Sequence, residues 1–233
     1  MIMNTVEKMI IASLKELAKI ANEEEKSIKQ QNSRLIFPKY CRNHSKEKKQ
    51  TSEKRVSEQE SRLLFIRELE EQNEFYYSIE TPTTKSYKFS NKGEKESEPN
   101  IVAVDSGGRS ASFDLTLYDV NYERKHFIEF KNENVSTVKK DFLKLLCDET
   151  GKENYFVNII ERENLSKGKT LESIKTKYQE AVDYVKDKID PDQHTSSVLK
   201  IILFNIEDMN FIQFKDISLK QNTSIEELKN EIL

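Results

Sequence analysis

The stretch FDLTLYDVNYERKHFIEFKN, residues 113–132, puts charged side chains inside segments whose apolar residues are typical of buried strands. Its first half alternates apolar and polar residues, a polar turn follows, and the second half contains an apolar run. The charged residues in question are Asp114, Glu129 and Lys131. Moving a charge from water into a protein interior costs several kcal/mol unless the charge is paired or binds a metal ion. These three side chains therefore either face solvent or take part in chemistry.

The two halves of this stretch form a predicted β-hairpin, because each favours a strand and the residues between them favour a turn. Five E-x-K triplets occur in the chain, but only Glu129-Phe130-Lys131 follows an apolar run. Residues two apart in a strand share a face, so Glu129 and Lys131 point the same way. Asp114 lies on the partner strand and sits beside them if the strands bend apart at that level. The alternative is a solvent-facing ion pair of Asp114 or Glu129 with Lys131, which an edge position would favour.

Two carboxylates and a lysine can divide the work of phosphodiester hydrolysis. Carboxylate oxygens suit a hard divalent cation such as Mg²⁺, which keeps several waters and takes phosphate oxygens as further ligands. Such an ion lowers the pKa of a bound water and neutralises charge that develops on the phosphate. A lysine beside it can orient that water, help to deprotonate it, or stabilise negative charge.

Asp114 followed by Glu129-Phe130-Lys131 on a hairpin partner resembles the active-site signature of the PD-(D/E)xK nuclease superfamily, which has the restriction-endonuclease-like fold. The resemblance implies a helix, a three-stranded antiparallel meander, a second helix and a further strand, and residues 57–161 are expected to follow that order. It also implies that Asp114 and Glu129 hold Mg²⁺ or Mn²⁺, while Lys131 serves the attacking water. The residue before Asp114 is Phe113 rather than proline, so the signature amounts to three residues in order.

The resemblance further implies supporting residues on the flanking helices. Several members carry a glutamate on the helix before the meander. Glu60 is the first candidate, because it precedes Leu63 and Leu64 by three and four residues and so shares the inward face expected for them. Glu58 is the alternative, and Glu60 has an equally weighted role as the capping-box partner of Ser57. The candidates for contact with nucleic acid are Arg109, Lys140 and Lys144. A solvated helix face explains the two lysines about as well, and packing or solvation explains the arginine better.

Hydrophobic periodicity and turn residues predict an α/β (α+β) protein with a central mixed sheet flanked by helices on both sides. The expected helices cover residues 5–29, 57–72, 136–151, 170–189 and 224–233. The expected strands cover residues 75–90 with a bend at Pro82, 101–104, 110–119, 125–132, 154–161, 197–207 and 211–219. The runs at 154–161 and 197–207 are almost continuously apolar, which is typical of strands buried on both faces. Residues 211–219 are expected at a sheet edge.

Residues 1–56 are expected to form an N-terminal amphipathic helix and a basic linker, and residues 57–233 the nuclease-like domain. The helix, capped by Asn4 or Thr5, either packs on the domain or mediates self-association into a homodimer or with a partner subunit. The Lys and Arg residues of the linker outnumber its Glu residues, so it could contact phosphates. The alternative is a solvated tether.

The composition narrows the possible functions. A net charge of −3 with 34% charged residues means that any binding of nucleic acid is local. Five glycines and no GxxxxGKS/T or GxGxxG pattern leave little room for a phosphate-cradling loop. The two cysteines, Cys41 and Cys147, are typical of free thiols in a reducing compartment. With no run of about 18 apolar residues and a poor signal peptide, a cytoplasmic protein without membrane contact is expected.

The expected function is therefore that of a metal-dependent endonuclease or exonuclease that acts on DNA. A role in defence against foreign DNA or in DNA repair follows only by analogy at the level of the fold. Two alternatives stay open. One is a catalytically inactive module with the same fold, which binds nucleic acid or a protein partner. The other is a structural or interaction protein that uses its long amphipathic helices and binds neither metal nor nucleic acid.

Overall fold

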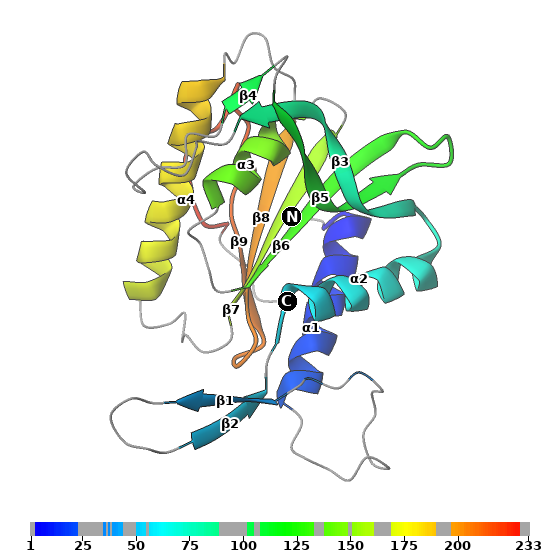
Figure 1. Cartoon of the computed structure of the whole chain (residues 1–233), viewed down its shortest axis with the longest axis vertical. Coiled ribbons are helices and arrows are strands. Elements are labelled where there is room, and N and C mark those ends of the chain that lie inside the picture. Colours follow the sequence, from blue (N-terminus) through cyan, green and yellow to red (C-terminus); the bar gives the residue numbers. More distant parts are fainter. Residues whose placement is uncertain are drawn as a thin grey trace.

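The hairpin of residues 113–132 lies in the middle of the main sheet in the computed structural model of the chain (Figure 1). The structure describes residues 3–22, 35, 37, 39–43, 50–54, 56–88, 102–104, 108–132, 138–148, 151–160, 169–189 and 197–228. The helices in these residues are α1 (Thr5–Asn22), α2 (Glu58–Gln72), α3 (Val138–Cys147) and α4 (Lys169–Lys188). The strands are β1 (Lys39–Asn43), β2 (Gln50–Lys54), β3 (Tyr76–Lys88), β4 (Val102–Val104), β5 (Arg109–Tyr118), β6 (Arg124–Asn132), β7 (Glu153–Ile160), β8 (Val198–Asn205) and β9 (Asn210–Gln213).

Strands β3 to β9 form one mixed sheet in the order β4-β3-β5-β6-β7-β8-β9. β3, β5 and β6 make an antiparallel meander, whereas β7 and β8 continue the sheet parallel to β6. Parallel neighbours need a crossover connection, and the chain passes through α3 before β7 and through α4 before β8. β7 and β8 are almost entirely buried, as their apolar runs predicted, and β9 lies at an edge. The prediction of an α/β protein with a mixed sheet is confirmed.

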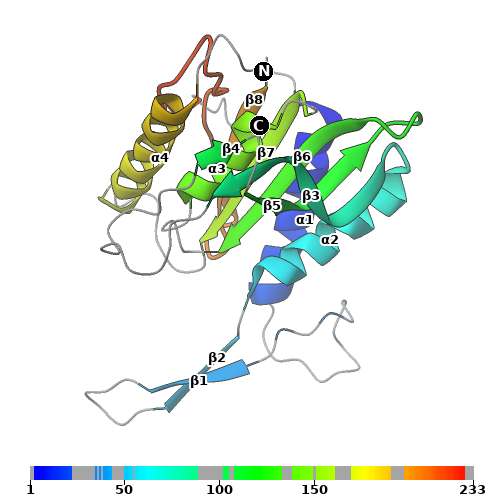
Figure 2. The ribbon, with the colours of Figure 1, turned by 45° about the horizontal axis from the view of Figure 1, so that its top comes forward.

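Helices cover both faces of this sheet (Figures 1 and 2). α1 and α2 share one hydrophobic cluster with the sheet, and that cluster includes Ile128 and Phe130 of β6. α3 and α4 form the second cluster on the opposite face, which includes Phe127. β6 therefore alternates between the two cores, as the period of a strand requires. No helix in the described part of the chain is long and apolar enough to span a membrane.

α1 belongs to the core of the domain. Its buried apolar residues are Val6, Met9, Ile10, Ile11, Leu14, Leu17, Ala18 and Ile20. The side chain of Asn4 caps the helix by accepting a hydrogen bond from the Glu7 N–H at 2.9 Å. The same side chain donates to the Tyr155 hydroxyl of β7 at 2.8 Å and to the Glu153 carboxylate at 2.9 Å. The helix thus packs on the domain, while the predicted continuation at residues 23–29 lies outside the described residues.

The predicted linker contains two strands, β1 and β2, that no pattern in the sequence indicated. β1 and β2 pair with each other in antiparallel fashion and form a sheet of their own. Figures 1 and 2 show this hairpin projecting away from the main sheet. The segments KYCRN and QTSEK carry no regular alternation of apolar and polar residues, which is the pattern that predicts a half-buried strand.

The predicted C-terminal helix at residues 224–233 is wrong where the structure describes it, at residues 224–228. This segment runs beside the chain that follows β9, and the Lys215 N–H donates to the Glu226 carbonyl at 2.8 Å. Ser224 and the spacing of apolar residues favoured a capped helix. Contacts with the rest of the fold override such local preferences.

Replacing Leu14 by alanine tests whether α1 belongs to the cooperative core. Because Leu14 is fully buried, we expect Leu14→Ala to lower the free energy of unfolding by about 2–5 kcal/mol. Urea denaturation followed by circular dichroism measures this change. The neighbouring Lys15 is exposed, so the control Lys15→Ala should change it by less than about 0.5 kcal/mol. Equal stability of the two variants would mean that α1 does not unfold with the core.

Candidate active site

β5 and β6 separate at the level of Asp114 and Glu129. Backbone pairing between the two described strands ends at Leu115 and Ile128. Beyond that pair, the carboxylate of Asp114 accepts a hydrogen bond from the backbone N–H of Phe130 at 2.8 Å. Asp114 thus takes the place of a strand carbonyl. The sequence predicted that Asp114 could lie beside Glu129 only if the two strands bend apart at this level. Their backbone pairing ends at this level.

On the α3 side of this opening, Lys144 is the counter-ion of two carboxylates. Its Nζ lies 2.5 Å from Oε1 of Glu129 and 3.3 Å from Oδ1 of Asp141. It also donates to the backbone carbonyl of Ser112 at 2.9 Å. Glu129 is 6% exposed and Lys144 is 4% exposed. Lys144, predicted as a contact for nucleic acid, therefore lies inside the protein against the acidic residues.

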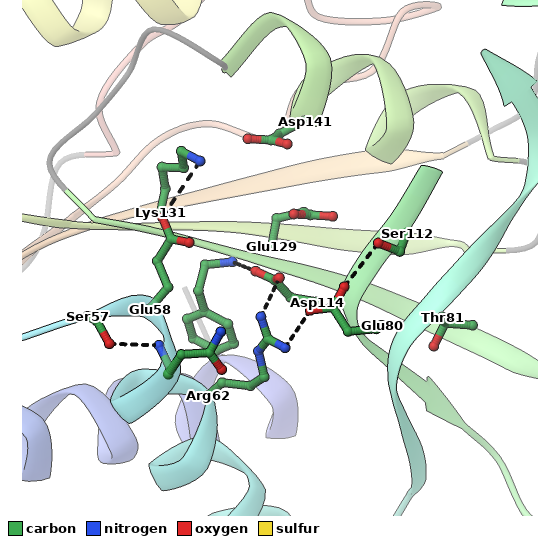
Figure 3. A network of polar contacts seen from close by, with 12 residues as sticks. Ser57, Glu58, Arg62, Glu80, Thr81, Ser112, Asp114, Glu129, Lys131 and Asp141 are labelled. Atoms are coloured by element: carbon green, nitrogen blue, oxygen red, sulfur yellow. Dashed lines mark hydrogen bonds and ion pairs between the residues drawn. The ribbon is translucent and has the colours of Figure 1, made fainter. Parts of the chain in front are cut away.

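On the α2 side, Arg62 holds Asp114. Its Nη2 lies 2.7 Å from Oδ1 of Asp114, and its Nη1 lies 2.7 Å from Oε1 of Glu80 (Figure 3). In the register of β3 against β5, Ile79 lies opposite Leu115 and Thr81 opposite Phe113, so Glu80 lies at the level of Asp114. The Ser112 hydroxyl donates to the Glu80 carboxylate at 3.0 Å. The φ angle of Glu80 is 52°, in the left-handed region that non-glycine residues rarely adopt. Glu80 therefore completes an ion-pair network on the edge of the opening.

Arg62 and Glu80 were not among the predicted site residues. Leu63 was expected on the buried face of α2, but it is 56% exposed, whereas Phe65 is fully buried. The inward face of α2 is therefore rotated and runs through Arg62, Phe65 and Leu69. An arginine at helical spacing from two buried apolar residues is a signal that could have identified Arg62. Glu80 gave no such signal, because its position depends on the register of β3.

The rotation of α2 places Glu58, rather than Glu60, next to Lys131. Oε1 of Glu58 accepts a hydrogen bond from the Asn132 N–H at 3.1 Å and lies 3.6 Å from Nζ of Lys131. Glu60 accepts a hydrogen bond from the Ser57 N–H at 2.9 Å and completes the capping box of α2. Figure 3 shows the Glu58 carboxylate next to the Lys131 ammonium. Glu60 thus has the capping role, which was one of the two roles weighed for it from the sequence.

The remaining predicted residues differ in their relation to this cluster. The side chains of Lys131 and Asp114 are 21% and 15% exposed, so both retain access to solvent. Arg109 is exposed at the start of β5. No hydrogen bond or ion pair within the described residues joins it to the cluster. Lys140 is half-buried in the first turn of α3.

Carboxylates outnumber basic side chains around Glu129. Burial raises the pKa of Glu129 above its ordinary value of 4.5; the Lys144 ammonium opposes this shift, while Asp141 and Asp114 add to it. Burial also raises the pKa of Asp114, although a backbone N–H and Arg62 oppose it. For Lys144, burial alone would lower the pKa, but Glu129 and Asp141 outweigh it and raise the pKa, so this lysine stays charged. Burial, reinforced at Glu129 by the neighbouring carboxylates, thus favours the protonated forms of Glu129 and Asp114.

Asp114 and Glu129 are the residues that fit a divalent cation. Carboxylate oxygens are hard ligands, and both carboxylates have lone pairs beyond the hydrogen bonds that they accept from Phe130, Arg62 and Lys144. Among the described residues, no three or more His, Cys, Asp or Glu side chains form a group that could hold a metal ion. The other ligands would then be water and substrate oxygens, as is usual for Mg²⁺.

Comparisons of the chain with protein-family models, curated proteins and solved structures found no match. What this site can do therefore has to be inferred from its own geometry and chemistry.

The variant Glu129→Gln should change how stability depends on pH. A carboxyl group whose pKa is raised in the folded state binds its proton more tightly there than in the unfolded chain. The free energy of unfolding of the wild type should therefore carry a contribution from Glu129 that is lost as the pH rises from about 4.5 towards about 8. Glutamine does not titrate, so the variant should gain stability relative to the wild type across this window.

Urea denaturation at a series of pH values measures that difference. Glu172→Gln is the control, because Glu172 lies on the surface of α4, and its difference from the wild type should show no comparable trend. If the advantage of Glu129→Gln instead shrinks with rising pH, Lys144 rather than burial controls the protonation of Glu129.

Proposed function

We propose that this chain is a metal-dependent nuclease of the PD-(D/E)xK type, which hydrolyses phosphodiester bonds with DNA as its substrate. The observation that carries the proposal is that β5 and β6 separate where Asp114 and Glu129 lie on neighbouring strands, with Lys131 two residues after Glu129 on β6. Two carboxylates and a lysine at one opening provide ligands for a hard cation and a group that can act on water.

The order of the elements supports this proposal. α2, the meander β3-β5-β6, α3 and then β7 beside β6 follow the sequence of elements that a restriction-endonuclease-like fold implies. β5 and β6 are inner strands, flanked by β3 and β7. The competing explanation of the three charges, a solvent-facing pair on an edge hairpin, is therefore disfavoured.

Each residue of the site has a role in the proposed reaction. Asp114 and Glu129 would hold Mg²⁺ or Mn²⁺, which would supply a water of lowered pKa and neutralise charge on the phosphate. Lys131, on the same face of β6 as Glu129, would orient the attacking water and take part in its deprotonation. Glu58 would position the Lys131 ammonium, and Arg62 would fix the orientation of Asp114.

The β1–β2 hairpin supports a nucleic-acid substrate. β2 ends at Lys54, and the site helix α2 begins at Glu58, so the hairpin is joined directly to the site. Its strands carry Lys39, Arg42 and Lys54 against a single acidic residue, Glu53. Basic side chains that neutralise phosphates supply much of the affinity for nucleic acid. A role in defence or repair, and self-association to cut both strands of a duplex, would extend this proposal.

The second candidate function is an inactive module of the same fold. Arg62 and Lys144 already neutralise Asp114 and Glu129. Basic side chains in these positions compete with a metal ion for the same carboxylates. If they hold the carboxylates too firmly, the site would bind nucleic acid or a protein partner without cleaving a bond.

Cleavage assays on plasmid DNA, single-stranded DNA and RNA, each with Mg²⁺ and with Mn²⁺, test the proposed function. We expect the wild type to cut at least one of these substrates. Asp114→Asn removes a metal ligand and Lys131→Ala removes the group that acts on water, so each should lower the rate by about 10²-fold or more. The matched controls Asp119→Asn and Lys125→Ala alter the exposed turn of the hairpin and should retain the rate.

Thermal melting with and without Mn²⁺ separates the two candidate functions. A ligand that binds the folded state raises the melting temperature, so Mn²⁺ should stabilise the wild type but not Asp114→Asn. Binding of nucleic acid without cleavage and without a metal effect would favour the inactive module. Equal cleavage by wild type and variants would assign the activity to another site or to a contaminant.

The pair Glu58→Gln and Glu60→Gln tests which helix carboxylate supports the reaction. Glu58 contacts Lys131, so Glu58→Gln should lower the cleavage rate severalfold. Glutamine also completes a capping box, so Glu60→Gln should keep both the helix and the rate. Initial rates of the two purified variants on the best substrate give the comparison. A loss confined to Glu60→Gln would restore Glu60 as the supporting carboxylate.

A further inference from the structure

A pocket of about 410 Å³ lies between the end of α2, the start of β3 and the turn between β5 and β6. Its walls are mostly aromatic rings, supplied by Phe75, Tyr76, Tyr77, Tyr118 and Tyr122. The nearest point to the candidate active site along β5 is Tyr118, four residues from Asp114, or about 13 Å at ~3.3 Å per residue. The pocket is therefore distinct from the opening that holds the acidic residues.

Two of these large aromatic side chains are exposed to solvent. Tyr76 is 52% exposed and Tyr122 is 69% exposed. Their ring centroids lie 4.9 Å apart at an interplanar angle of 33°. The turn that carries Tyr122 is held in shape by Asp119, whose carboxylate accepts the N–H groups of Asn121 and Glu123 at 2.9 and 3.0 Å. The rings are thus presented on a fixed support.

The surroundings of the pocket are acidic. Glu70 lines it and accepts a hydrogen bond from the Tyr77 hydroxyl at 2.7 Å. The C-terminal end of a helix carries a partial negative charge that basic residues commonly offset, yet the last turn of α2 has no basic residue. Glu71 and Glu74 add further carboxylates along the sequence at this end, and the ion-pair partner of Glu71 is Arg67, at 3.9 Å. The pocket therefore combines electron-rich ring faces with acidic surroundings.

We propose that this pocket binds a cationic side chain, arginine or lysine, from a basic peptide segment of a partner protein. Cations are attracted to the faces of aromatic rings. The carboxylates around the pocket attract the same cation by their negative charge. Stacking of nucleic-acid bases on the tyrosines is the competing use of such rings. The acidic surroundings disfavour it, because they repel phosphates. This inference goes beyond the proposed function and does not depend on it.

Fluorescence anisotropy with a labelled arginine-glycine peptide tests the proposal. Its glutamate-glycine counterpart and labelled oligothymidylate serve as comparison probes, and EDTA in the buffer prevents metal-dependent cleavage of the oligonucleotide. The arginine peptide should bind the wild type. Tyr76→Ala removes a ring face and Glu70→Gln removes a charge, so each should weaken binding by roughly twofold to fivefold.

Matched controls show whether the effect belongs to the pocket. Met209→Ala removes an exposed apolar side chain elsewhere, and Glu172→Gln removes a surface charge on α4; both should bind the peptide as the wild type does. Melting temperatures confirm that the variants are folded, because Tyr76 is largely exposed and glutamine can still accept the Tyr77 hydrogen bond. Absence of binding, or equal binding by all variants, overturns the proposal. Binding of oligothymidylate that Tyr76→Ala loses and Glu70→Gln keeps overturns it in favour of base stacking.

Discussion

One hydrogen bond, from the backbone N–H of Phe130 to the carboxylate of Asp114, allows β5 and β6 to separate within the sheet. Strands that part leave peptide groups without partners, and an unsatisfied buried group costs about 1–3 kcal/mol. Asp114 replaces the missing strand carbonyl, so this N–H keeps a partner. Arg62 from α2 and Lys144 from α3 then contact the acidic residues of the two strands. The candidate site therefore depends on the Asp114 carboxylate, which accepts the hydrogen bond that a backbone carbonyl would otherwise accept.

The charges beside the two strands form two sets of ion pairs rather than isolated pairs. Arg62 contacts Glu80 and Asp114, and Lys144 contacts Glu129 and Asp141. Replacing buried ion pairs by apolar residues is often neutral or stabilising, so reinforcement of the fold is a weak reason for this arrangement. An excess of carboxylates beside two inner strands is better explained by a ligand of positive charge. Under the proposed function that ligand is a metal ion, which would compete with Arg62 and Lys144 for their partners.

The sequence was sufficient for the parts of the fold that have a strong local pattern. The hairpin of residues 113–132 and the buried runs in β7 and β8 could be predicted from the spacing of their apolar residues, and Asp114 and Glu129 could be placed on the two strands of that hairpin. What depends on the rotation or register of whole elements could not. Leu63 and Phe65 are equally apolar, and only the packing of α2 decides which of them faces the core. Residues 224–228 favoured a helix locally, but pairing with the chain after β9 prevails.

The position of α1 has a consequence for the synthesis of the protein. α1 leaves the ribosome before every other described element, yet Asn4 binds Glu153 and Tyr155 of β7, and its core includes Ile202 and Phe204 of β8. α2 is translated early, but the residues of β7 and β8 in the same hydrophobic cluster do not exist until most of the chain has been translated. A segment whose packing partners are synthesised much later exposes apolar surface in the meantime and is prone to aggregation. The burial of the first helix is therefore completed only when β7 and β8 have been made.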